Sequence, residues 1–213
     1  MNSPASMPPL KCQRPRTASG FTLVETLFVL AIMVMLFAVA AAGAKKSWQS
    51  QELRASVIHL AHDMNLASVA AQRLNKPVVV RFYLYQADAI ASPDPHYHAY
   101  QLMVHDAAAG TTVPLYELQT LEGTTLISAN PRFSSILYTP QTQNPAQDPD
   151  LGIGPYQYVD VEFRPNSSTN LATNVAPWTI TLIPARAADD VGTLPTDYQA
   201  LCVHPDSGTV HIY

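Results

Sequence analysis

The chain is poor in cysteine and in charged residues. Its two cysteines, Cys12 and Cys202, cannot form a disulfide-dense scaffold or a four-cysteine zinc module. Only 13% of the 213 residues are charged, and 12 basic against 16 acidic side chains leave a net charge of −4. That balance is too acidic for a general nucleic-acid coat. The hydrophobic content of 47% is too high for a disordered chain, so the length predicts one globular domain and a further segment.

Proline is missing from one long stretch of the chain. Residues 21–76 contain none, whereas residues 77–213 contain fourteen. Because proline breaks the hydrogen-bond ladder of a helix, its absence favours one helix over about 21–75 that ends before Pro77. The first 20 residues form a separate leader that holds three bases and no acid.

The first part of the expected helix is an apolar run with a single charge. Glu25 is the only charged residue between positions 21 and 44, and the run is long enough to cross a membrane, which takes about 20 apolar helical residues. A secretory signal peptide that ends near Ala40–Ala42 and a plain membrane anchor are two interpretations. Neither explains Glu25, because an acid inside a membrane helix is costly and usually functional.

A third interpretation comes from the residues around Glu25. The string Gly20–Glu25 (GFTLVE), which follows the basic leader and opens the apolar run, resembles the class III signal of type IV prepilins and type II secretion pseudopilins. The resemblance implies that a prepilin peptidase cuts between Gly20 and Phe21 and methylates the new N-terminus at Phe21. It also implies that Glu25 is the counter-charge of a neighbouring subunit's terminal ammonium, an attraction that a low-dielectric filament core strengthens. The assembly residues expected on this basis are Glu25, Thr22, Leu23 and Val24.

The second part of the expected helix, residues 45–76, is amphipathic. Its apolar residues are spaced alternately by four and three positions, as on one face of a helix. This stripe consists of Leu53, Val57, Leu60, Met64, Ala67, Ala71 and Leu74. We expect it to pack on a sheet formed by the rest of the chain, and a coiled-coil seam is the alternative. The spacing of His59 and His62 can hold a metal, but two solvated histidines are the favoured interpretation.

The remainder of the chain, residues 77–213, favours short strands. Turn-forming clusters separate β-branched and aromatic runs, which predicts an antiparallel β head. The expected strands are Val78–Tyr85, Tyr97–Val104, Val113–Leu118, Thr124–Ile127, Tyr158–Phe163, Trp178–Ile183, Ala200–His204 and Thr209–Tyr213. The last two should form a hairpin across Pro205–Gly208. Residues 139–156 predict a long loop, with a solvated acidic tip favoured over a calcium site at Asp148 and Asp150.

The order of helix, amphipathic continuation and sheet resembles the minor-pseudopilin family called GspH/FimT. It fits equally a prepilin-type set described from verrucomicrobial genomes as cassette protein D. The resemblance rests on Leu60–Ser68, on Asn75–Val78 and on the terminal hairpin at Ser207–Ile212. A Phe-x-Pro-x-Gly motif of the family is matched in part by Phe163–Pro165, with Ser167 where glycine is expected.

Some members of that family bind DNA through basic residues near the last hairpin. In this chain Thr209 and His211 stand at those positions, and residues 77–213 hold four bases against thirteen acids. Because phosphate contacts need cationic side chains, we expect no nucleic-acid binding.

No arrangement of residues indicates catalysis. His96, His98 and His105 form the best candidate cluster, since two histidines two positions apart on a strand share a face, but surface histidines that flank a turn are favoured. Cys202 lies in an apolar context and is expected to be a core residue rather than a nucleophile. The sequence has no phosphate loop, dinucleotide motif or Gly-x-Ser-x-Gly elbow. We therefore predict no catalytic residue, no metal and no cofactor.

These patterns predict an α+β chain with a pilin-like organisation. Its parts are a leader (1–20), a transmembrane and assembly helix (21–44), a helical continuation (45–76) and the β head (77–213). The expected function is that of a minor pilin or pseudopilin. Prepilin peptidase would process it, the inner membrane would hold it by one pass with the head in the periplasm, and other pilin or pseudopilin subunits would assemble with it into a type IV pilus or type II secretion pseudopilus. A membrane-anchored periplasmic binding module is the alternative.

Overall fold

The computed structural model of the chain describes residues 22–86, 94–106, 110–138, 144–147, 151–174, 177–187 and 193–213. The chain divides into two compact units, Met1–Ala44 and Lys45–Tyr213. The expected leader, the cleavage-site residues Gly20 and Phe21, and the pair Asp148 and Asp150 all lie outside the described residues.

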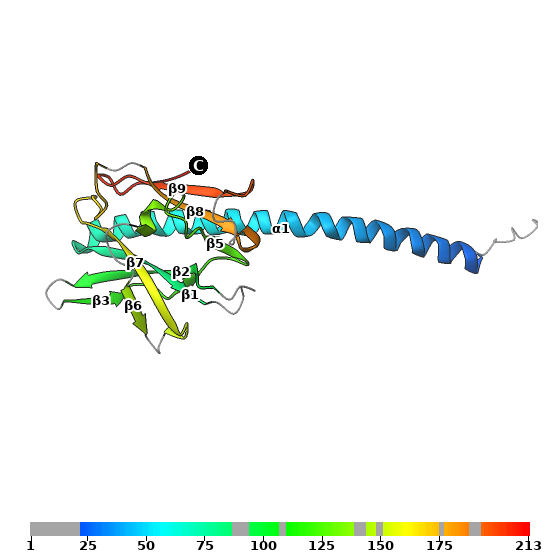
Figure 1. Ribbon diagram of the computed structural model, residues 1–213, viewed down its shortest axis with the longest axis horizontal. Helices are drawn as coiled ribbons and strands as arrows, with labels where there is room; N and C mark the ends of the chain where they lie inside the picture. Colours follow the sequence, from blue (N-terminus) through cyan, green and yellow to red (C-terminus); the bar gives the residue numbers. More distant parts are fainter. Residues whose placement is uncertain are drawn as a thin grey trace, which may run out of the picture. The chain divides into compact units, whose positions relative to one another are not determined.

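One long helix, α1, runs from Leu23 to Leu74 and is drawn in blue to cyan in Figure 1. The helix expected over 21–75 is therefore confirmed within the described residues. It ends because Asn75 adopts a left-handed backbone conformation, with φ of 49°, which is the usual way a helix closes its last turn. Pro77 follows two residues later and cannot continue a helix.

The expected apolar stripe of α1 is buried in the second unit, with one exception. The buried residues of the stripe are Leu53, Val57, Leu60, Met64, Ala67 and Ala71. Leu74 is 47% exposed, so the prediction was wrong there, because Leu74 is the last helical residue before the chain reverses at Asn75. The stripe packs in one core with sheet residues such as Phe82 and Ile180. The coiled-coil alternative is therefore wrong.

The ten strands of the described chain form one sheet with the order β10-β9-β8-β5-β2-β1-β7-β6, and β3 and β4 pair with β2. The strands are β1 (Val78–Tyr85), β2 (His96–Asp106), β3 (Thr111–Pro114), β4 (Gln119–Thr120), β5 (Thr125–Ile127), β6 (Asn144–Gln147), β7 (Pro155–Phe163), β8 (Trp178–Pro184), β9 (Gln199–Val203) and β10 (Val210–Ile212). Neighbours pair antiparallel. In Figure 1, β8 and β9 are drawn above the second half of α1 and β1 and β2 below it. Both groups contribute to the core around the helix, and the α+β prediction is confirmed.

Most strand positions agree with the sequence patterns. The prediction matches β1 at both ends, and β2, β5, β7, β8, β9 and β10 lie within a few residues of their expected bounds. The hairpin across Pro205–Gly208 forms, with Val210 opposite Val203. The run expected at Val113–Leu118 is the poorest match, because pairing with β2 ends at Pro114, whose nitrogen has no hydrogen to donate. The short strand β4 was not predicted.

The segment 139–156 is not wholly a loop, so this prediction was wrong. Its residues 144–147 form β6, which pairs with β7 from Asn144 opposite Tyr158 to Gln147 opposite Pro155. A composition rich in proline and polar residues does not reveal such a strand, because the pairing is tertiary. Pro145 is tolerated because β6 is at the edge of the sheet.

Both faces of the central strands are covered. Alternate residues of β1 point to opposite sides of the sheet: Val80 and Phe82 join the core that contains α1, whereas Tyr83 and Tyr85 join a second, smaller cluster. That cluster also contains Tyr156, and Leu151, Ile153 and Leu194 pack against it. Burial on two sides explains why β1 reads as a nearly continuous apolar run rather than as an alternation.

Polar contacts fix α1 against the sheet. The hydroxyl of Tyr100 on β2 donates to Asp63 Oδ2 at 2.8 Å. The backbone N–H of Val210 on β10 donates to Asn65 Oδ1 at 3.3 Å, while the amide nitrogen of Asn65 donates to the carbonyl of Ala61. These contacts hold the central strand β2 and the edge strand β10 on one stretch of the helix.

Candidate functional site

The candidate functional site is the first part of α1, in the unit Met1–Ala44. Most side chains from Leu23 to Val39 are apolar, and the large apolar side chains are 47–79% exposed. They are Leu23, Val24, Leu27, Phe28, Val29, Leu30, Ile32, Met33, Val34, Met35, Leu36, Phe37 and Val39. Because four consecutive residues of a helix point around its whole circumference, the run Leu27–Leu30 leaves no polar side. A helix that is apolar all round is found buried, in a protein core or a membrane.

No helix among the described residues combines the length and the hydropathy needed to cross a membrane. The transmembrane assignment of 21–44 therefore stays a prediction.

The start of α1 is held by a side-chain cap. Thr22 immediately precedes the helix, and its Oγ1 accepts a hydrogen bond from the backbone N–H of Glu25 at 3.3 Å. The hydroxyl of Thr26 donates to the carbonyl of Leu23 at 2.9 Å. A Thr-x-x-Glu sequence at a helix start is the capping-box pattern, and it also places an acid where the helix dipole is positive. The structure thus brings Thr22 and Glu25 together.

The expected assembly residues share this exposed helix start. Thr22 and Glu25 are exposed, and Leu23 and Val24 are 79% and 76% exposed. The sequence reasoning treated Thr22 only as part of the signal string. The Thr-x-x-Glu spacing was the signal that identifies it as the helix cap.

The histidines do not form a metal site within the described part of the chain, where no group of three potential ligands comes together. His59 and His62 are exposed, and His59 Nε2 lies 3.9 Å from Glu122 Oε1. His98 is buried, which corrects its expected surface position. Its Nδ1 donates to the carbonyl of Thr125 at 2.9 Å, and burial lowers its pKa, so that the ring is neutral at pH 7.

The remaining candidate side chains are those of His105, His96 and Cys202. His105 Nδ1 lies 3.4 Å from Thr112 Oγ1, and Nε2 of His96 is buried without a hydrogen-bond partner. Cys202 is half-buried rather than in the core, because its neighbours Leu201 and Val203 take the core-facing positions of β9. Partial burial raises the pKa of the Cys202 thiol, which disfavours the nucleophilic thiolate.

Comparison with known proteins concerns mainly the N-terminal segment. Residues 15–41 match the family model of the prokaryotic N-terminal methylation motif. None of the curated proteins matches the sequence. Among solved structures, the minor pseudopilin EpsH from the Type 2 Secretion System of Vibrio cholerae is similar at 10% sequence identity, with a TM-score of 0.42, over 76% of this chain and 96% of that chain.

The match over residues 15–41 includes Gly20, Phe21 and Glu25, and it confirms the resemblance predicted from the string Gly20–Glu25. The chain therefore combines the N-terminal methylation motif with a long helix and an antiparallel sheet.

Proposed function

We propose that the chain is a minor pilin or pseudopilin, a structural subunit that is cut between Gly20 and Phe21 and methylated at Phe21 by prepilin peptidase. The observation that carries the proposal is the exposed apolar surface of α1 from Leu27 to Val39, which lies within the segment that matches the methylation motif. Such a surface needs a cover, and the helices of neighbouring subunits or the lipid of the membrane provide one.

Glu25 is the proposed register residue of the assembly. It is the one charged residue in an otherwise uncharged segment of 24 residues, and its side chain is exposed. Cleavage at Gly20 would create an ammonium group at Phe21. In a low-dielectric filament core, an ammonium and a carboxylate on neighbouring subunits attract strongly and offset one another's loss of hydration.

The proposed location before assembly is the inner membrane, crossed once by residues 21–44. The three bases of the leader and its lack of acids favour retention on the cytoplasmic side. The unit Lys45–Tyr213 would then face the periplasm. We infer a structural rather than a catalytic role, because the candidate histidines and Cys202 occupy structural positions in the described chain.

The first experiment determines the intact mass and the N-terminal residue of the protein extracted from membranes. A chain that begins at a methylated Phe21 supports the proposal. An intact leader, or a chain that begins near Gly43, contradicts it and favours an anchor or a secretion signal.

A second experiment separates the filament subunit from the alternative of a membrane-anchored periplasmic binding module. Glu25→Gln removes the register charge, and Glu117→Gln, an exposed acid of the head, is the matched control. A filament subunit should lose incorporation into the sheared filament fraction with Glu25→Gln only. A binding module should remain in the membrane fraction unchanged with both variants.

The absence of nucleic-acid binding stays a prediction that a mobility-shift assay can check. Binding of DNA by the chain at low salt that disappears as salt increases would contradict it, since this is the signature of phosphate contacts.

A further inference from the structure

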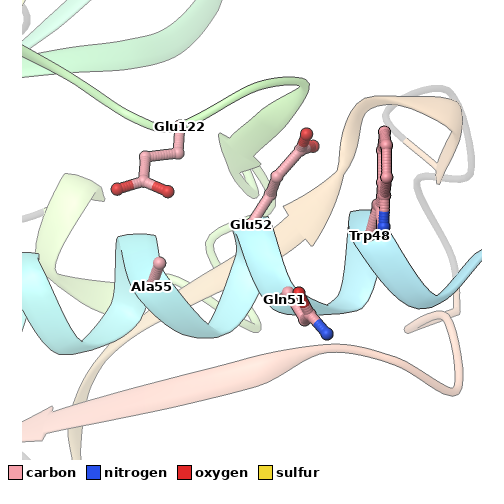
Figure 2. Close-up of a pocket in the computed structure, with 5 residues that line it drawn as sticks. All are labelled: Trp48, Gln51, Glu52, Ala55 and Glu122. Carbon is pink, nitrogen blue, oxygen red and sulfur yellow. The ribbon is translucent and has the colours of Figure 1, made fainter.

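An open pocket of about 360 Å³ lies on the second unit, between the first turns of its part of α1 and the loop before β5. It is lined by Trp48, Gln51, Glu52, Ala55 and Glu122. Figure 2 shows the carboxylates of Glu52 and Glu122 on the same side of α1, with the indole of Trp48 beside Glu52 and Gln51 directed away from them. The helical spacing of Trp48, Glu52 and Ala55 places all three on one face, and the small side chain of Ala55 leaves the space between the two acids open.

The backbone of the loop that carries Glu122 is fixed against α1. The backbone N–H of Glu122 donates to the hydroxyl of Ser56 at 2.8 Å, and the preceding residue, Leu121, is buried in the core. Gly123 has a positive φ of 58°, a conformation that favours glycine. The carboxylate of Glu52 lies beside this glycine, in the space that a Cβ would occupy.

The pocket is lined by two acidic side chains, Glu52 and Glu122. Among the described side chains, no lysine or arginine pairs with Glu52 or Glu122. The ion-pair contact of Glu122 is with His59, whose Nε2 lies 3.9 Å away. The aromatic wall is available as well, because Trp48 is 69% exposed. Trp178, by contrast, is buried and donates its indole N–H to the carbonyl of Ala172 at 2.7 Å.

We propose that this pocket is a docking site for a basic side chain, an arginine or a lysine, of a partner protein. The argument is charge complementarity. Two carboxylates and the face of an indole are the groups that attract a guanidinium or ammonium ion, and tryptophan is the best aromatic partner for a cation. Tryptophan and arginine are also the residues that contribute most to protein interfaces. A lipid headgroup fits less well, because its phosphate would be repelled by both acids.

The test uses the full chain in detergent and a blocked tripeptide, acetyl-Gly-Arg-Gly-amide, at constant ionic strength. The indole N–H resonance of Trp48 reports binding, and that of the buried Trp178 is the internal reference. We expect a saturable shift at Trp48 only, with a dissociation constant on the order of millimolar. The matching peptide with citrulline, which has the same shape without the charge, should produce no saturable shift.

Variants assign the interaction to the pocket. Glu52→Gln and Glu122→Gln should each weaken binding about threefold to tenfold. Glu117→Gln removes the same charge from an exposed position outside the pocket and should leave the affinity unchanged. The proposal is overturned by equal binding of the citrulline peptide. It is also overturned if Glu117→Gln weakens binding as much as the pocket variants do, or if Ca²⁺ alone saturates the same shift and displaces the peptide.

Discussion

The hydrogen bond between Tyr100 and Asp63 links β2 to α1, and its removal is the sharpest test of how the head holds the helix. Tyr100 is 3% exposed, and its hydroxyl lies 2.8 Å from Asp63 Oδ2. A hydrogen bond to a charged acceptor contributes about 1.5–3 kcal/mol. Because Asp63 is only half-buried and can bind water instead, we expect Tyr100→Phe to lower the free energy of unfolding by about 1.5–2 kcal/mol at pH 7.

The same substitution should change how stability depends on pH. Burial raises the pKa of the Tyr100 hydroxyl above its usual value, and the hydrogen bond to Asp63 and the charge of Asp63 raise it further. The unfolded chain therefore releases this proton first, at about pH 10. Above that pH the unfolded state binds fewer protons than the folded state, so stability falls by about 1.4 kcal/mol for each pH unit. Tyr100→Phe lacks this contribution, and its deficit relative to the natural chain should shrink between pH 10 and pH 11.

Urea unfolding of the full chain in detergent, followed by the fluorescence of the buried Trp178, measures both effects. Tyr116→Phe is the matched control, because the Tyr116 side chain is 48% exposed and the substitution should change the free energy little. Burial also raises the pKa of Tyr85, so some loss of stability above pH 10 remains in every variant. A cost of less than about 0.5 kcal/mol for Tyr100→Phe, or a pH slope equal to that of the natural chain, would refute the reasoning.

Three further substitutions test other parts of the structure. Thr22→Val should lower the helix content of the N-terminal segment by removing a cap that contributes about 1 kcal/mol. Thr22→Ser should preserve the helix content, and circular dichroism of the processed chain in detergent measures both variants. Ser167 has a positive φ of 70°, which strains any residue other than glycine. Ser167→Gly should therefore stabilise the chain by about 0.5 kcal/mol in the same urea assay, because the relief of strain exceeds the loss of the hydrogen bond from Gln72. Ser167→Ala should destabilise the chain. Asp160→Asn breaks a bidentate pair with Arg81, whose two contacts are both 2.8 Å, and should cost about 1–2 kcal/mol, less at high salt.

The sequence predicted the helix and most of the sheet because their signals are local. The lack of proline over 21–76 and the four-and-three spacing of the stripe depend on neighbouring residues alone, and six of the seven stripe residues are buried. Strand β6 and the burial of His98 depend on partners distant in the chain. The pairing of Tyr83 with Ala99 and of Leu84 with Tyr97 leaves His98 unpaired. A bulge of this kind redirects a side chain, and no spacing rule reveals it in advance.

Ser167 has a backbone conformation that favours glycine. The Phe-x-Pro-x-Gly motif, which the sequence resembles in part, has glycine at this position, and the structure places Ser167 in the left-handed region that glycine adopts without strain. Gly208 leaves room for this turn, since a Cβ at position 208 would lie 2.8 Å from the carbonyl oxygen of Ser167. Glycine at position 208 thus allows the turn at Ser167 to retain its shape.

The cap at the start of α1 also bears on the proposed role of Glu25. Thr22 binds the backbone N–H of Glu25, so the cap uses the main chain of Glu25 and leaves its carboxylate available. An acid that only completed a capping box would be replaceable by glutamine, which is equally common at that position. An acid that also neutralises a neighbour's ammonium is not replaceable, because glutamine has the shape but lacks the charge. If Glu25→Gln preserves the helix content and still prevents assembly, the charge itself sets the register between subunits.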